Sequence, residues 1–179
     1  MATDSELQEL IDEHQLRKLV HAYCRAVDRG DIERLRDLYH HDAVDAHGGF
    51  SAGSADEFLA QLVAARPYLR SMQHNITTVN FAISGHTAEG EIYTIATQTL
   101  IGRDRDVDVV VGGRYLDKYE KRDGAWKLSA RTIVTDWAHV NDPSTVDISH
   151  PITRGTLQGT LDATDPSHGF FSLLGQRPQ

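Results

Sequence analysis

The hydrophobic period of this chain changes near Gln73, and that change limits the folds it can adopt. Before Gln73, apolar residues recur at intervals of three and four, the period of an amphipathic α-helix. After it, apolar and polar residues alternate over long runs, as in half-buried β-strands. Helices followed by strands favour an α+β fold, with helices packed on one face of a curved antiparallel sheet.

The helical part predicts three helices with clear ends. We expect them over residues 5–29, 32–39 and 54–66, with a short strand and loop over 40–50. The apolar stripe of the first consists of Leu16, Leu19, Val20, Tyr23 and Val27. Gly30 suits the left-handed residue after its last turn, and Asp31 can cap the next helix. Ser54 and Glu57 have the spacing of a capping box.

The strand part predicts a meander of long antiparallel strands. The expected strands are 74–83, 91–102, 106–120 and 125–140. Asp123-Gly124, between the last two, is a strong hairpin signal. We therefore expect one α+β domain over residues 1–140. Residues 141–179 hold four prolines and no sustained period, so we expect a C-terminal extension that is either disordered or a lid or inter-subunit arm.

Composition and charge exclude several partner classes. The net charge of −8 and the lack of a basic stripe argue against nucleic acid. The single cysteine, Cys24, excludes an intrachain disulfide and a cysteine-rich zinc site. No apolar run is long enough to span a membrane, and the first residues lack the pattern of a signal peptide. We expect a cytoplasmic protein with a small apolar ligand, and neither nucleic acid nor a membrane as partner.

Asp28 is the first candidate for chemistry, because it continues the buried side of the first helix. A buried carboxylate is costly unless it is paired or hydrogen-bonded. It could cap a neighbouring segment or pair with an arginine. It could also hold His74, which opens the first long strand. A carboxylate that accepts from one imidazole nitrogen fixes the tautomer, and the other nitrogen can then act as a general base. His74 could equally be structural.

Tyr23 and Arg131 are the further candidates. Tyr23 could direct its hydroxyl into a pocket or belong to the core. Strict alternation places Arg131 on the face of the last strand opposite Trp126 and Leu128. It could stabilise a developing anion or form a surface salt bridge.

A metal site is an alternative for the run from Tyr39 to His47. On a strand, His41, Asp45 and His47 would share a face, but their spacing matches no standard zinc pattern. We therefore expect no metal.

Two segments carry a family resemblance. The segment from Tyr23 to Asp31, followed by Leu38-Tyr39 and Asp42-Ala43-Val44, resembles the SnoaL-like branch of the nuclear transport factor 2-like superfold. The hairpin around Asp123-Gly124, from Gly112 to Leu128, resembles a hallmark of that branch. The similarity covers about residues 5–140. It implies a conical barrel of a curved, mostly antiparallel sheet, helices over its concave face, and homodimers or homotrimers.

The resemblance also implies a catalytic pair. Within the branch, the pattern is similar to scytalone dehydratase, hexachlorocyclohexane dehydrochlorinase and bile acid 7α-dehydratase, in which an Asp–His dyad acts without metal or cofactor. The dyad corresponds to Asp28 and His74, and the assisting residues to Tyr23 and Arg131. The dehydrochlorinase's lysine near Tyr23 is missing here. In place of the bile acid enzyme's further aspartate, the second long strand offers Thr94, Thr97, Gln98 and Thr99.

These observations lead to one main expectation and several alternatives. The main one is a cofactor-independent lyase, a dehydratase or dehydrohalogenase, acting on a small, apolar, cyclic substrate. An isomerase or a polyketide-type cyclase would need the same base. A non-catalytic ligand-binding or assembly module, or the small subunit of a ring-hydroxylating dioxygenase, would share the fold.

Overall fold

The computed structural model describes residues 3–141 and 157–166. The helices are α1 (Asp4–Arg29), α2 (Ile32–Asp37) and α3 (Ala55–Ala65), with the 3₁₀ turn η1 (Arg66–Tyr68) after α3. The strands are β1 (Tyr39–Ala46), β2 (Ala52–Ser54), β3 (Leu69–Ser84), β4 (Thr87–Leu100), β5 (Val107–Arg122) and β6 (Ala125–Asn141). The expected order of helices and long strands is confirmed.

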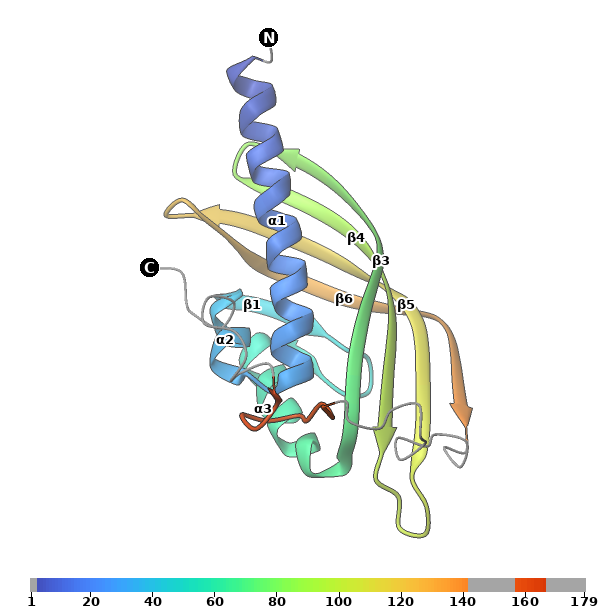
Figure 1. Ribbon diagram of the computed structural model, residues 1–179. Coiled ribbons are helices and arrows are strands. Elements are labelled where there is room, and N and C mark those ends of the chain that lie inside the picture. Colours follow the sequence, from blue (N-terminus) through green and yellow to red (C-terminus); the bar gives the residue numbers. More distant parts are fainter. Residues whose placement is uncertain (1–2, 142–156, 167–179) are drawn as a thin grey trace.

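The strands form one curved sheet in the order β2-β1-β6-β5-β4-β3. All neighbouring strands are antiparallel except β1 and β6, which run parallel. Figure 1 shows the long strands bending around α1, with α2 and α3 beside its C-terminal half. In the described part of the chain the sheet has two free edges, so it forms an open cone. The predicted α+β class, with helices over the concave face of a mostly antiparallel sheet, is confirmed.

The ends of the elements follow local residue chemistry. Capping boxes begin α1 at Thr3 and α3 at Ser54, and Gly30 ends α1 at a φ of 64°. α2 is two residues shorter than expected, because Tyr39 already pairs with β6. The expected Asp123-Gly124 turn has positive φ at both residues, as a tight hairpin requires.

A buried carboxylate fixes α1 to the sheet. Asp12 accepts hydrogen bonds from Lys121 Nζ (2.7 Å), Trp126 Nε1 (2.8 Å) and Gln8 Nε2 (3.1 Å). Farther along the helix, its apolar stripe packs into the core. The largest apolar side chains with almost no exposure are Leu16, Val20, Tyr23, Leu35, Phe58, Leu59, Ile92, Tyr119 and Leu128.

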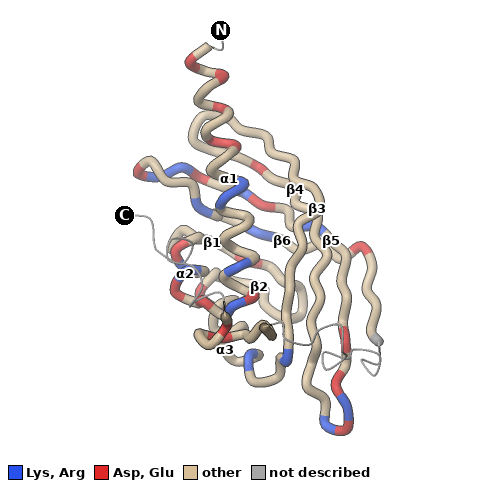
Figure 2. The backbone as a smooth tube through the Cα atoms, in the orientation of Figure 1, with Lys and Arg blue, Asp and Glu red and all other residues tan. Residues whose placement is uncertain are grey.

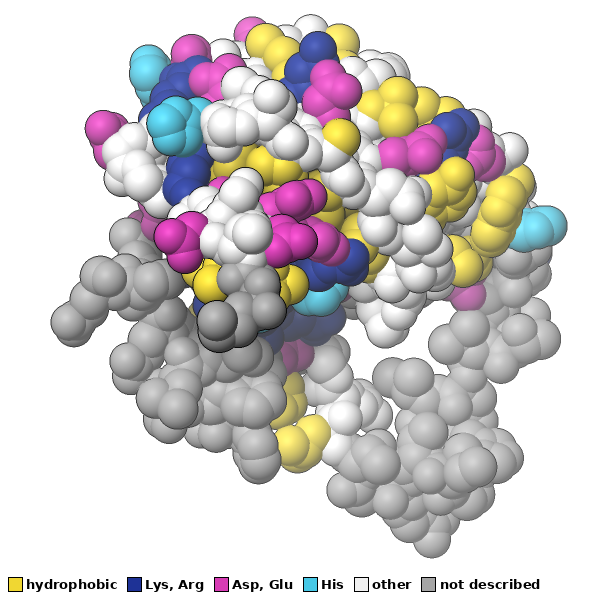
Figure 3. Space-filling view, turned by 90° about the horizontal axis from the view of Figure 1, so that it is seen from above, with side chains coloured by type: hydrophobic (Ala, Val, Ile, Leu, Met, Phe, Trp, Pro, Cys, Tyr) yellow, Lys and Arg dark blue, Asp and Glu magenta, His cyan; other side chains and the backbone are white. Residues whose placement is uncertain are grey.

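The first turns of α1 project beyond the sheet (Figure 1). Leu7, Leu10 and Ile11 are 47–65% exposed there. Figure 3 looks down on the molecule from above and shows apolar side chains interspersed with charged ones. Figure 2 likewise shows basic and acidic residues mixed along the described elements. Neither view shows a basic stripe.

A β-bulge changes the side-chain phase of β6. Tyr119 pairs with Leu128 and Lys118 with Ala130, so Ser129 is the extra residue. Arg131 therefore lies on the same inner side as Leu128, and both are buried. The expectation that Arg131 lies opposite Leu128 was wrong, because it assumed unbroken alternation.

The described part of the extension, residues 157–166, contacts the end of α1. Arg29 Nη1 donates to the carbonyl of Thr160 (2.7 Å) and to Asp165 Oδ2 (3.0 Å). Most of residues 141–179 lies outside the described residues, so a lid or inter-subunit arm stays a prediction. No helix in the described ranges has the length and apolar character needed to cross a membrane.

Candidate active site

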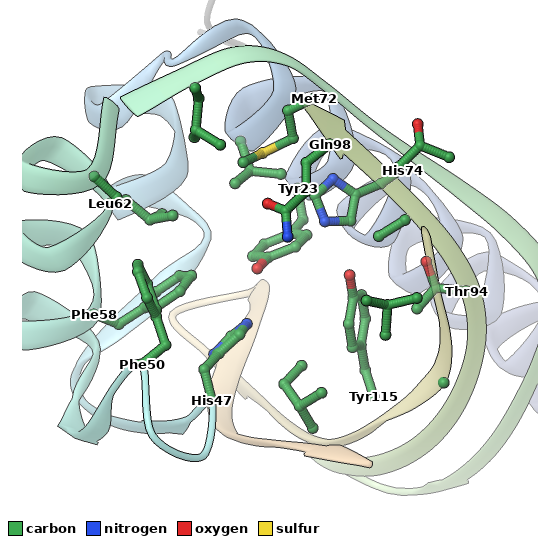
Figure 4. Close-up of a pocket in the computed structure, with 18 of the residues that line it drawn as sticks. Tyr23, His47, Phe50, Phe58, Leu62, Met72, His74, Thr94, Gln98 and Tyr115 are labelled. Atoms are coloured by element: carbon green, nitrogen blue, oxygen red, sulfur yellow. The ribbon is translucent and has the colours of Figure 1, made fainter. Parts of the chain in front are cut away.

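A cavity of about 420 Å³ lies between the helices and the concave face of the sheet. Its apolar lining includes Val27, Phe50, Phe58, Leu62, Met72 and Ile133. Figure 4 shows polar side chains entering the same space from several elements. An apolar pocket with a few convergent polar groups is typical of a small-molecule site.

Asp28 and His74, predicted as a pair, are in contact. Asp28 lies in the last turn of α1 and His74 in β3, 46 residues later. His74 Nδ1 is 2.6 Å from Asp28 Oδ1, and the His74 backbone N–H donates to Asp28 Oδ2 at 3.0 Å. Because a carboxylate only accepts, Nδ1 carries the hydrogen and Nε2 is the nitrogen left for a ligand. The His74 side chain is 13% exposed and lines the cavity.

Arg131 does not line the cavity. Its guanidinium is fully buried and forms a two-point ion pair with Asp117. The guanidinium carbon lies 4.0 Å from the centroid of the Tyr23 ring and 4.1 Å from that of Tyr115. Burial opposes the charge, but Asp117 outweighs it and holds the pKa of Arg131 well above its ordinary value. Arg131 was expected to stabilise a developing anion or to form a surface salt bridge. In the structure it forms a buried ion pair and supports two tyrosine rings.

Tyr23 and Tyr115 both direct their hydroxyls into the cavity (Figure 4). Burial raises the pKa of each above its ordinary value, so both hydroxyls stay neutral hydrogen-bond donors at any working pH. Tyr23 was a predicted site residue and Tyr115 was not. Alternation in β5 could have found Tyr115, because Tyr115, Asp117 and Tyr119 are all buried on one face.

A second histidine, His47, also enters the cavity. Its Nδ1 contacts Asp45 Oδ1, and Tyr39 donates its hydroxyl to Asp45 Oδ2 at 2.7 Å. Its ring stacks on Phe58, with centroids 4.2 Å apart and planes 11° from parallel. Sequence reasoning considered Asp45 and His47 only as metal ligands.

The metal alternative lacks its third ligand. His41 is exposed and borders a separate polar hollow with His40, away from His47. Within residues 3–141 and 157–166, no three His, Cys, Asp or Glu side chains come together in a group that could hold an ion.

The second long strand supplies neutral polar groups to the cavity wall. Thr94, Thr97 and Gln98 of β4 all line it. Thr94 Oγ1 is buried without a hydrogen-bond partner among the described residues. The wall therefore carries hydroxyl and amide groups where the resemblance would place a carboxylate.

The open cone with an internal cavity defines a protein of the nuclear transport factor 2-like fold. More specifically, the chain belongs to the SnoaL-like domain family, whose model matches residues 8–132. No curated protein sequence matches the chain.

Solved structures share the fold at low sequence identity. A protein of Novosphingobium aromaticivorans, with a proposed scytalone dehydratase activity, is 20% identical and has a TM-score of 0.66, covering 75% of this chain and 92% of its own. The type 3 hexachlorocyclohexane dehydrochlorinase LinA of Novosphingobium barchaimii is 19% identical with a TM-score of 0.68, covering 75% and 93%. A proposed dehydratase of Streptomyces avermitilis is 17% identical with a TM-score of 0.61, covering 71% and 98%.

Proposed function

We propose that this protein is a cofactor-independent lyase that eliminates water or halide from a small, apolar, cyclic substrate. The observation that carries the proposal is the 2.6 Å contact between Asp28 and His74 at the wall of an open cavity. The similarity to structures of a dehydrochlorinase and of proposed dehydratases supports the same reaction class.

In this mechanism His74 is the general base. Its Nε2 takes a proton from a substrate carbon, while Asp28 holds the ring and stabilises the imidazolium that forms. The negative charge that develops on the substrate meets the neutral hydroxyls of Tyr23 and Tyr115. Arg131 acts as a positioning residue, because it fixes both tyrosine rings from behind.

The lining favours a neutral substrate. Among the lining residues the one Lys or Arg is Arg114, and its guanidinium pairs with Glu91 (2.8 Å) and Asp136 (2.8 Å). No lining Lys or Arg is thus left to bind a carboxylate or phosphate. A ring compound that offers a carbonyl or hydroxyl to the tyrosines suits the remaining surface.

The geometry of the site bears differently on two alternatives to a lyase. A non-catalytic module would need no contact between Asp28 and His74 and could fill the cavity with side chains, so the contact and the open cavity argue against it. An isomerase or cyclase would use the same base. Product analysis distinguishes these from a lyase, because a lyase releases water or halide.

The test is a comparison of histidine variants on a panel of cyclic β-hydroxy and β-halo ketones. We expect His74→Ala to lose elimination activity, and His41→Ala, at an exposed histidine outside the cavity, to keep it. Circular dichroism and urea unfolding check that both variants fold. Full activity in folded His74→Ala would overturn the proposal.

The assembly and location are proposals as well. We expect a homodimer or homotrimer in the cytoplasm, formed through the sheet, on which Tyr93, Leu116 and Trp137 are exposed. Light scattering coupled to size-exclusion chromatography measures the mass. A monomer at micromolar concentration would contradict the expectation.

A further inference from the structure

The cavity contains two histidines that are held in the same way. His74 and His47 each direct Nδ1 to a carboxylate, Asp28 and Asp45 respectively. They come from different parts of the fold, since His74 is in β3 and His47 follows β1. Figure 4 shows the two rings on different walls of the cavity, with the Tyr23 hydroxyl between them.

His47 is held in place by a buried carboxylate and by an aromatic stack. The Asp45 side chain has no exposure and is already bound by the Tyr39 hydroxyl. The ring is further fixed by stacking on Phe58, yet its side chain stays 19% exposed at the cavity. Because Nδ1 is held by Asp45, Nε2 is the nitrogen that can reach a ligand.

We propose that His47 is the general acid of the cavity. This inference rests on the proposed lyase function and extends it. The protonated His47 donates its Nε2 proton to the leaving oxygen, while His74 removes the proton from the carbon next to the carbonyl. Asp45 is a positioning residue that holds the imidazolium ring.

The reaction balances without a co-reactant. The C–H bond breaks to His74 Nε2, its electron pair forms the C=C bond, and the C–O bond breaks as the oxygen takes the His47 proton and leaves as water. His74 ends protonated and His47 neutral, so proton exchange with solvent restores both. Hydroxide is a poor leaving group that needs this proton, whereas chloride leaves as an anion. A built proton donor therefore favours a hydroxyl leaving group over a halide.

Three probes isolate each step in the full-length protein. Deuterium exchange into cyclohexanone in D₂O reports proton removal alone. Elimination from 3-chlorocyclohexanone reports proton removal with a leaving group that needs no acid. Elimination from 3-hydroxycyclohexanone needs both steps and gives the same product, cyclohex-2-enone, which is followed by its ultraviolet absorbance.

The key variant is His47→Gln, whose amide can still donate to Asp45 but cannot transfer a proton. We expect it to slow elimination of the hydroxyl probe by about 10²-fold or more. Exchange and chloride elimination should change by less than about threefold, since a proton donor contributes nothing to them. Asp45→Asn should show the same selectivity to a smaller extent, which a purely structural role would not produce.

The outcomes separate this inference from the proposed function. If no probe reacts in a His74-dependent manner, the lyase function and this inference both fail. If His74→Ala slows all three reactions but His47→Gln slows none or all equally, only the inference fails. Urea unfolding of His47→Gln excludes loss of fold as the cause of a general decrease.

Discussion

Arg131 of β6 and Asp117 of β5 lie opposite each other in the sheet and form an ion pair without any exposed side-chain surface. The Nε–Oδ1 and Nη2–Oδ2 distances are both 2.7 Å. The Tyr119 hydroxyl donates to the same carboxylate at 2.5 Å. This pair lies directly behind the tyrosine rings of the cavity, so stability and site geometry depend on one contact.

Breaking this pair should destabilise the protein strongly. We expect Arg131→Met to lower the free energy of unfolding by about 3–5 kcal/mol, because it leaves the Asp117 charge buried without its partner. The double variant Arg131→Met/Asp117→Leu removes both charges and should lose less. Urea denaturation of the single and double variants measures both effects. A double variant less stable than Arg131→Met would contradict this explanation.

Tyr23→Phe should reduce turnover and leave the fold intact. In the proposed mechanism the Tyr23 hydroxyl donates to the developing anion, so we expect kcat for elimination to fall by about 10²-fold. The ring that packs against Arg131 is retained, and stability should change by less than about 1 kcal/mol. Steady-state kinetics on the ketone probes and thermal unfolding give the two values. An unchanged kcat would remove Tyr23 from the mechanism.

Alkaline pH should weaken the fold through its buried tyrosines. Burial raises the folded-state pKa of Tyr23, Tyr39, Tyr115 and Tyr119. The stability that these tyrosines contribute is fully present below about pH 10, where their side chains are neutral in both the folded and the unfolded chain. Above that pH the unfolded chain releases protons that the folded chain retains, so stability falls.

The share of each tyrosine in this decrease of stability with pH can be measured with single variants. We expect the free energy of unfolding in Tyr115→Phe to fall less steeply between pH 10 and 11, by about 1 kcal/mol over that unit, because a tyrosine of the unfolded chain is about half ionised at pH 10 and about nine-tenths ionised at pH 11. Urea titrations at pH 8, 10 and 11 provide the comparison. Parallel curves for the variant and the original protein would show that Tyr115 ionises equally in both states.

Asp12 should make the free energy of unfolding decrease at acid pH. Burial raises the pKa of this carboxyl, but the hydrogen bonds from Lys121, Trp126 and Gln8 outweigh burial and hold it below its ordinary value. The resulting stability is present above about pH 4 and is lost as pH falls, because the unfolded chain takes up the proton first. Asp12→Asn should therefore cost about 1–3 kcal/mol at pH 7 and progressively less toward pH 3. A pH-independent cost would show that Asp12 acts without its charge.

Cys24 should be inert in the folded protein. The thiol is buried, and burial raises its pKa to about 12. Because the thiolate is the nucleophile, we expect almost no reaction with an aromatic disulfide reagent at pH 8 and rapid reaction in urea. The rate in folded protein should follow unfolding. Fast labelling without denaturant would show that the end of α1 opens locally.

Local patterns predicted most of the fold. The stripe that ends at Val27, the caps at Gly30 and Ser54, and the Asp123-Gly124 turn each depend on neighbours in sequence, so the sequence alone indicates them. The bulge at Ser129 has no such local signal, and it changed the face expected for Arg131. The parallel pairing of β1 with β6 depends on the whole sheet and was equally beyond local patterns.

The candidate site was only partly predictable for the same reason. Asp28 was indicated by its buried helical position and His74 by the need of that carboxylate for a partner, and the family resemblance supported the pair. His47 was read as a metal ligand, because its proton-transfer geometry depends on a contact with Asp45 and a stack on Phe58 that spacing does not reveal. The importance of Tyr115 depends on a tertiary contact, because Arg131 lies over its ring as well as over that of Tyr23.

The polar groups of the cavity come from two different parts of the sequence. Both histidines and both of their carboxylates fall between Asp28 and His74, while β4, β5 and β6 supply the opposite wall. The residues proposed for proton transfer therefore belong to the first stretch, whereas the second supplies much of the wall that a ligand would contact. Substitutions at wall positions of the later stretch, such as Thr97 and Gln98, would therefore change the lining of the cavity without replacing either histidine or its carboxylate.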